Sequence, residues 1–209
     1  MTAPSSELPL RPDAPSGAVR PVRRWLPAGL VALAISVTVL GGFVVAETLP
    51  EPESRPVALA GVLVVRPLSG WEVAHREALT VPTPAGLLSG EFAQITRGSG
   101  ALDLLAFPGV GRGEFELADA YVREVLSRQL ERLSVSHRVE AVVLRSGVEA
   151  LRFGYIGSEP RSGSAVEGSV TVVVSPAGNG AVFDGWAFRG QLELLLEELA
   201  AMVDGAEVA

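Results

Sequence analysis

The stretch GEFAQITRGSGALDLLAFPG, residues 90–109, has the pattern of a β-hairpin. Phe92 and Ile95 lead into a glycine-rich turn at 98–100, and an apolar run from 102 to 107 returns and ends at a Pro-Gly pair. Glycine accepts the positive φ angles of tight turns, and proline ends a strand because it lacks a backbone N–H. The stretch therefore predicts two antiparallel strands joined by a short turn.

Further strands are predicted on both sides of this hairpin, because short runs rich in valine and aromatic residues alternate with glycine and proline. The turn Gly178-Asn179-Gly180, whose residues tolerate positive φ, precedes the last of them. The predicted strands are 61–67, 70–82, 139–145, 148–158, 168–176 and 181–189.

The apolar spacing changes to a helical period at two places. Residues 114–134 carry a stripe of Leu117, Tyr121, Val125, Leu130 and Leu133, with acids near the start and Arg128 and Arg132 near the end, as a helix dipole favours. Residues 190–205 form the second predicted helix, with glycine at each end and a stripe formed by Leu192, Leu195, Leu196, Leu199, Met202 and Val203. Strands grouped around two helices predict an α+β fold, an antiparallel β-sheet with two packed helices.

This order of elements resembles the PsbP-like fold, known from the photosystem protein PsbP and from actinobacterial extracytoplasmic proteins of the LpqN type. The likeness covers residues 61–204 and is carried by SGWEVAHREAL, ITRGSGALDLLAF, EALRFGYIG and AVFDGWAFRGQLELLLEELAAMV. The resemblance implies a non-enzymatic adaptor or assembly factor. The chain departs from the lipoproteins because it has no cysteine to accept a lipid.

An apolar segment precedes this domain. Residues 25–46 are 22 uncharged residues, which as a helix would extend about 33 Å, enough to cross the bilayer's hydrocarbon core. Arg20, Arg23 and Arg24 come before the segment and acidic residues follow it, so the positive-inside rule places the N-terminus in the cytoplasm. We expect an uncleaved, single-pass transmembrane helix in the cell membrane.

Two other interpretations of this segment stay open. Cleavage after Ala46 would make it a signal peptide, although the apolar run is longer than the usual 7–15 residues of such peptides. The second alternative interpretation is a twin-arginine export signal at residues 23–24. Small residues every four positions, Ala28-Ala32-Ser36, would allow a homodimer through the helix, although chance also produces this spacing in an alanine-rich chain.

The expected organisation has four parts. Residues 1–24, rich in proline, form a disordered cytoplasmic tail, and residues 47–60 form an extracytoplasmic stalk after the helix at 25–46. Residues 61–205 form the PsbP-like α+β domain. The residues after Ala46 carry a net charge of −9, against +2 for the tail, and this acidic outer part argues against nucleic acid as a partner.

No catalytic or metal site is predicted, because the chain has no cysteine, only two histidines and no nucleophile or phosphate-loop motif. No cofactor is expected. His75 is interpreted as a strand residue with Glu77 on the same face, and His137 as a cation at the end of the first helix.

The aromatic residues supply the only binding hypothesis. Trp186 and Phe188, beside Arg189 and the start of the last helix, could line an apolar groove for an acidic or lipid-like ligand, and Trp71 is a similar residue. Packing in the core is the competing interpretation of these aromatics. The leading function is a non-catalytic binding or adaptor domain for an envelope protein or component. An envelope hydrolase, or a carrier of a small apolar or acidic ligand, is the alternative.

Overall fold

The computed structural model describes residues 55–83, 86–111 and 113–209. Within these residues, no helix is both long and apolar enough to cross a membrane. The predicted cytoplasmic tail at 1–24, the transmembrane helix at 25–46 and residues 47–54 of the predicted stalk lie outside the described residues.

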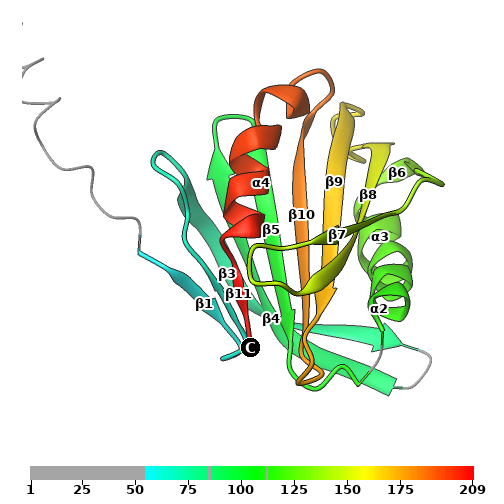
Figure 1. The fold of residues 1–209 in the computed structure, drawn as a ribbon. Coiled ribbons are helices and arrows are strands. Elements are labelled where there is room, and N and C mark those ends of the chain that lie inside the picture. Colours follow the sequence, from blue (N-terminus) through cyan, green and yellow to red (C-terminus); the bar gives the residue numbers. More distant parts are fainter. Residues whose placement is uncertain (1–54, 84–85, 112) are drawn as a thin grey trace, which may run out of the picture. The chain divides into compact units, whose positions relative to one another are not determined.

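The fold is built on a large antiparallel sheet (Figure 1). Its strand order is β3-β4-β5-β10-β9-β8-β6, and β7 also pairs with β8. A smaller sheet has the order β1-β2-β11. The strands are β1 Val57–Leu59, β2 Leu63–Val65, β3 Glu72–Thr83, β4 Gly86–Arg97, β5 Gly100–Phe107, β6 Glu131–Val135, β7 Glu140–Val143, β8 Glu149–Ser158, β9 Ala165–Val174, β10 Gly180–Phe188 and β11 Glu207–Val208.

Helices cover both faces of the large sheet. Between β5 and β6, α2 Glu114–Tyr121 continues through the π-helical turn η2 Val122–Leu126 into α3 Ser127–Gln129. After β10, the 3₁₀ turn η3 Leu192–Leu194 precedes α4 Leu196–Asp204. The antiparallel sheet with two helical segments that the sequence predicts is therefore confirmed.

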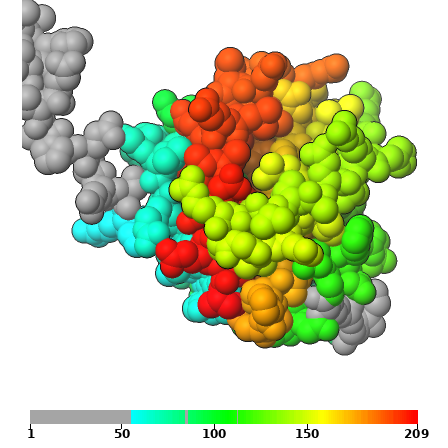
Figure 2. All heavy atoms as spheres, in the orientation of Figure 1, coloured from blue at the N-terminus to red at the C-terminus, as the bar shows by residue number. Residues whose placement is uncertain are grey.

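Each face of the sheet has its own hydrophobic core. On one face, α4 and the small sheet pack on side chains of β5 and β10 such as Leu104 and Phe183. Figures 1 and 2 show the molecule from the side of α4 and β7. On the other face, Tyr121 and Leu126 of the α2 segment pack on Leu105 of β5. Because side chains alternate along a strand, the central strands β5 and β10 are buried on both faces.

The first helix ends earlier than its spacing predicts. Residues 131–135 form β6, which pairs with β8, so Arg132 and Leu133 are strand residues and His137 follows a strand instead of a helix. The pairing is irregular between Glu131 and Ser134, and Arg132 has a φ of 50°. This bulge explains the error, because an extra residue lets Leu130 and Leu133 pack on one face at a helix-like spacing of three.

The buried stripe of the helical segment also changes within η2. Val125 packs against the core as predicted but is only partly buried, and Leu126 is the fully buried residue after Tyr121. A π-helical turn places residues five apart in register, whereas the α-helical period gives three or four. In α4, Leu199, Met202 and Val203 are buried as predicted, but Leu196 is exposed because η3 precedes the regular helix.

The folded domain extends beyond the predicted 61–205 at both ends. Val57 and Leu59 of β1 are buried, although residues 57–60 were predicted to be stalk. Ala60 and Gly61 have φ angles of 49° and 70° and close a tight hairpin between β1 and β2. At the other end, β11 pairs with β2, and the Ala209 N–H donates to the Val62 carbonyl.

Candidate ligand pocket beside a buried carboxyl pair

A row of polar side chains crosses the face of the sheet that α2 covers. His75 on β3 pairs in register with Gln94 on β4, Gln94 with Asp103 on β5, and Asp103 with Asp184 on β10. Residues paired directly across antiparallel strands project to the same side of the sheet. The row therefore leads from an exposed outer strand to the centre of the sheet.

Asp184 is the innermost member, with a residue exposure of 1%. The Tyr121 hydroxyl of α2 donates to its Oδ2 at 2.6 Å, and the Tyr155 hydroxyl of β8 lies 3.0 Å from both carboxyl oxygens. Two elements distant in sequence thus hold one carboxyl group. Such contacts offset part of the cost of burying a carboxyl group.

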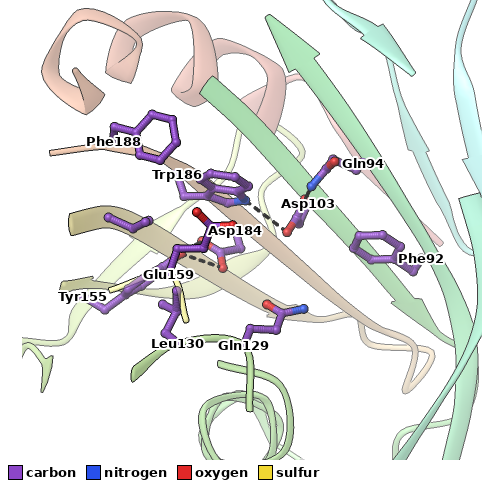
Figure 3. Close-up of a pocket in the computed structure, with 11 residues that line it drawn as sticks. Phe92, Gln94, Asp103, Gln129, Leu130, Tyr155, Glu159, Asp184, Trp186 and Phe188 are labelled. Carbon is purple, nitrogen blue, oxygen red and sulfur yellow. Dashed lines mark hydrogen bonds between the residues drawn. The ribbon is translucent and has the colours of Figure 1, made fainter. Parts of the chain in front are cut away.

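Asp103 is also buried, at 5% exposure, and it has different partners. Gln94 Nε2 donates to its Oδ1 at 2.8 Å, and Trp186 Nε1 donates to its Oδ2 at 3.1 Å (Figure 3). Within the described residues, no buried side-chain nitrogen or oxygen lacks a hydrogen-bond partner. The two aspartates therefore belong to a fully hydrogen-bonded network.

Burial changes the ionisation of this network. Loss of solvation, followed by repulsion from Asp103, raises the pKa of Asp184 to about 8, although the two tyrosine hydrogen bonds act in the opposite direction. Desolvation raises the pKa of Asp103 to about 6. Desolvation and the nearby Asp184 raise the pKa values of Tyr121 and Tyr155 well above their ordinary range, so both phenols remain protonated donors. The pair therefore holds protons at pH values where an exposed aspartate has none.

Gly168 on β9 gives Tyr155 the space to reach Asp184. A Cβ atom on Gly168 would lie 2.3 Å from Cζ of the Tyr155 ring. The two residues pair across β8 and β9, so the ring lies over the backbone of its neighbour. A glycine in the interior of a strand often marks such a close approach.

A pocket of about 290 Å³ opens next to the carboxyl pair (Figure 3). Its wall combines four aromatic side chains with two amides, three carboxylic acids and two aliphatic residues. The lining residues are Phe92, Gln94, Asp103, Gln129, Leu130, Tyr155, Glu159, Val166, Asp184, Trp186 and Phe188. They come from β4, β5, α3, β8, β9 and β10, with Leu130 directly after α3 and Glu159 directly after β8, so only the folded sheet and helix assemble them.

The electrostatic character of the pocket is acidic. None of the described lining residues is basic, and three of them carry carboxyl groups. Beside it on β3, His75 contacts Glu77, with 3.4 Å between Nε2 and Oε2, and its ring centroid lies 6.0 Å from that of Phe92. His75 and Glu77 do share one face of a strand, as the sequence predicts.

The four residues of the binding hypothesis lie in different places. Trp186 and Phe188 line the pocket, with Trp186 partly buried and Phe188 exposed at its margin. Trp71 lies in the core of the opposite face, where its Nε1 donates to Glu198 Oε2 at 2.7 Å. Arg189 is exposed and is not among the residues that line the pocket. The structure thus brings two of the four together.

Sequence reasoning missed the buried acids and their tyrosine partners. One signal was present: Asp103 and Asp184 each occupy the middle of an apolar run, in ALDLLAF and VFDGWAF. An acid in a strand that is otherwise apolar is informative because acids are rarely buried without partners. The pairing of the two aspartates required the strand register, which the sequence does not contain.

The pocket is lined by carboxyl, amide, aromatic and aliphatic side chains. Its described lining contains no serine, threonine, cysteine or histidine, so the pocket does not join His75 to an acid and a hydroxyl nucleophile. Among the described residues, no group of three or more histidine, aspartate or glutamate side chains could hold a metal ion.

A second cavity, of about 280 Å³, lies on the other face between the sheet and α4. Arg152, Ser169 and Thr171 supply its polar wall, and the Arg152 Nε donates to Thr171 Oγ1 at 3.2 Å. Leucine, alanine and valine side chains of α4 supply its apolar wall.

Comparisons with known proteins bear on the fold. No protein-family model and no curated protein matches the chain. Among solved structures, cyanobacterial PsbP (CyanoP) from Synechocystis sp. PCC 6803 aligns with a TM-score of 0.51 and 9% identity, over 78% of this chain and 96% of that one.

Two further structures match less well. LpqN, described as involved in cell envelope biogenesis of Mycobacterium tuberculosis, aligns with a TM-score of 0.44 and 13% identity over 74% of this chain and 90% of that one. PA94 from Pseudomonas aeruginosa, a protein of unknown function and putative regulator, aligns with a TM-score of 0.38 and 10% identity. That alignment covers 74% of this chain and 96% of that one. The alignment with cyanobacterial PsbP confirms that the described domain has the PsbP-like fold.

Proposed function

We propose that this chain is a single-pass membrane protein whose C-terminal domain lies outside the cytoplasm and binds an envelope component through the pocket beside Asp103 and Asp184. Binding is the proposed activity, and no catalytic step belongs to it. The apolar sequence 25–46 and its arginine flank support the anchor and its orientation. The observation that carries the binding role is the pocket itself.

Three properties of the pocket support binding. Its aromatic side chains supply apolar contact area, and its carboxyl and amide groups fix orientation, a combination typical of small-ligand sites. The hydrogen bonds to Asp184 and Asp103 hold the polar wall in place before a ligand arrives. Its volume of about 290 Å³ fits a small molecule or one group of a larger partner.

The test is a site-specific crosslink in intact cells. We expect a photoreactive amino acid at Phe188, on the margin of the pocket, to capture an envelope component. The same group at Val143 of β7, which is more exposed and is not among the lining residues, should not capture it. Gln129→Trp, which places an indole at the pocket wall, should abolish the Phe188 adduct. The adjacent exposed change Arg128→Trp should leave it intact, since Arg128 is not among the lining residues.

Equal adducts from positions 188 and 143, or an adduct that survives Gln129→Trp, would refute the binding role of the pocket. The topology has a separate test. A reporter enzyme that is active only outside the cytoplasm should be active when fused after Ala209, and activity of a cytoplasmic reporter at the same position would overturn the orientation.

A carrier of a small acidic amphiphile is the second candidate, and the cavity beneath α4 favours it. Arg152 and the hydroxyls of Ser169 and Thr171 suit an anionic head group, and the α4 side chains suit an alkyl chain. Binding of decanoate that is lost in Arg152→Gln would support this function, and unchanged binding in that variant would exclude it.

A further inference from the structure

We propose that the pocket selects ligands that carry an organic cation, an ammonium group in the first instance, and that their binding expels a proton from the Asp103–Asp184 pair. The inference rests on the proposed binding function and specifies its ligand class.

The charge of the pocket is the first observation. Asp103, Asp184 and Glu159 line it, and none of the described lining residues is basic. An anionic head group would meet three carboxyl groups and no compensating charge, so the acidic ligand that the sequence suggested is disfavoured at this site. A cation would stabilise the ionised form of the same groups.

The hydrogen-bond donors and acceptors of the pocket wall also favour a cationic ligand. Three donors of the wall already serve the carboxyl pair: Trp186 Nε1 and Gln94 Nε2 donate to Asp103, and the Tyr155 hydroxyl donates to Asp184. Each carboxylate has about four acceptor positions, and each oxygen of Asp103 accepts one of these side-chain hydrogen bonds, Oδ1 from Gln94 and Oδ2 from Trp186. The wall therefore retains acceptors, which suit a ligand rich in N–H donors.

The aromatic residues supply the second recognition element. Phe92, Tyr155, Trp186 and Phe188 all line the same pocket. Aromatic faces attract ammonium groups, most strongly where water is excluded. Aromatic walls combined with buried carboxyl groups thus distinguish this pocket from an acidic patch on an open surface.

The proton release follows from the position of the pair. Asp103 and Asp184 are register partners on adjacent strands, and repulsion between two ionised carboxyls keeps a proton in the empty site. The other titratable groups around them are Tyr121, Tyr155 and Glu159, with His75 and Glu77 on β3 beside Phe92. On the helical segment, the half-buried Glu124 pairs with the exposed Arg128. An arriving cation replaces the proton as the compensating charge, and the proton passes to solvent.

The experiment is calorimetric titration of the full-length protein in lipid nanodiscs. The probes are benzylammonium, which is charged throughout the range tested, its neutral counterpart benzyl alcohol and the anion benzoate. At pH 7.5 we expect benzylammonium to bind at least tenfold more tightly than benzyl alcohol, and benzoate not to bind. Titrations in phosphate and Tris, which differ in ionisation enthalpy, should reveal a released proton, and binding at pH 5 should be at least tenfold weaker.

Variants separate a charge effect from a general disturbance. Asp103→Asn keeps the size of the side chain and an acceptor oxygen, and it should remove the preference for benzylammonium over benzyl alcohol. Asp119→Asn removes an exposed carboxyl group on the outside of α2 and should change neither preference nor proton release. Thermal unfolding of each variant verifies that it remains folded.

The outcomes also distinguish this inference from the proposed function. Equal binding of benzyl alcohol and benzylammonium, or cation binding without proton release, would overturn the inference and leave the binding role in place. If none of the probes binds while the Phe188 crosslink is still lost in Gln129→Trp, the inference alone fails. If the crosslink is absent as well, both fail.

Discussion

Replacement of Asp184 by asparagine should change how the stability of the domain depends on pH. In the folded protein, burial and repulsion from Asp103 raise the pKa of Asp184 to about 8, whereas an exposed aspartate has a value near 3.8. Between these values the folded state keeps a proton that the unfolded state has released. The contribution of Asp184 to the free energy of unfolding is therefore greatest at low pH, and it falls as the pH rises from 3.8 to about 8.

The size of the effect follows from linkage. One additional proton in the folded state corresponds to a loss of about 1.4 kcal/mol for each pH unit. From pH 5 to pH 8 the wild-type domain should therefore lose roughly 3 to 4 kcal/mol through Asp184 alone. Asp184→Asn, which cannot ionise, removes this contribution. The measurement is urea unfolding of residues 51–209, which form one compact unit, at both pH values.

The comparison needs a carboxyl group whose removal should not matter. Asp119→Asn removes an exposed acid of α2, with 63% of its side-chain surface accessible, and should follow the wild-type pH dependence. Glu91 and Glu198, whose pKa values are lowered by hydrogen bonds, contribute in the opposite sense and only at acidic pH, and both remain in every variant. If Asp184→Asn and the wild type lose the same free energy between pH 5 and 8, the buried proton does not exist.

Three further predictions concern packing. Gly168→Ala should destabilise the domain by about 1–3 kcal/mol because the new Cβ overlaps the ring of Tyr155, whereas Gly154→Ala, with its nearest contact at 3.5 Å, should cost less; urea unfolding compares them. Leu59→Ala should cost about 2–5 kcal/mol in the same assay, and a loss below 1 kcal/mol would contradict the buried position of β1. Trp71→Phe should lower stability by about 1 kcal/mol and leave ligand binding unchanged, since its hydrogen bond joins α4 on the opposite face.

Local sequence signals were sufficient for most of the sheet. The hairpin at 90–109 forms as predicted, with β4 and β5 in continuous register from Glu91 to Gly100, because the turn glycines and the closing proline fix both ends. Runs rich in valine or aromatic residues, bounded by glycine and proline, predicted β8, β9 and β10 in the same way. Each of these elements is decided by residues close together in the chain.

The errors arose where the backbone departs from a regular period. The π-helical turn after Tyr121 and the bulge at Arg132 each shift the side-chain register by one residue. The three-residue spacing of Leu130 and Leu133 therefore fits both a helix and a bulged strand. Residues 131–135 form a strand instead of a helix because they pair with β8 at the edge of the sheet. The site was missed for a related reason: Trp186 and Phe188 are neighbours in sequence, but the acids beside them come together only through the pairing of β5 with β10.

The central rows of the sheet show that the fold does not require these acids. One row away on the same face, β5 and β10 place Leu105 opposite Val182, and this apolar pair packs into the α2 core. A similar pair at 103 and 184 would avoid the desolvation of two carboxyl groups and the need for tyrosine donors from α2 and β8. The chain instead places both acids at paired positions, satisfies each with hydrogen bonds and opens a pocket beside them. Rules of packing that are broken at one row and obeyed at the next indicate a requirement other than stability, and the ligand recognition proposed above would be such a requirement.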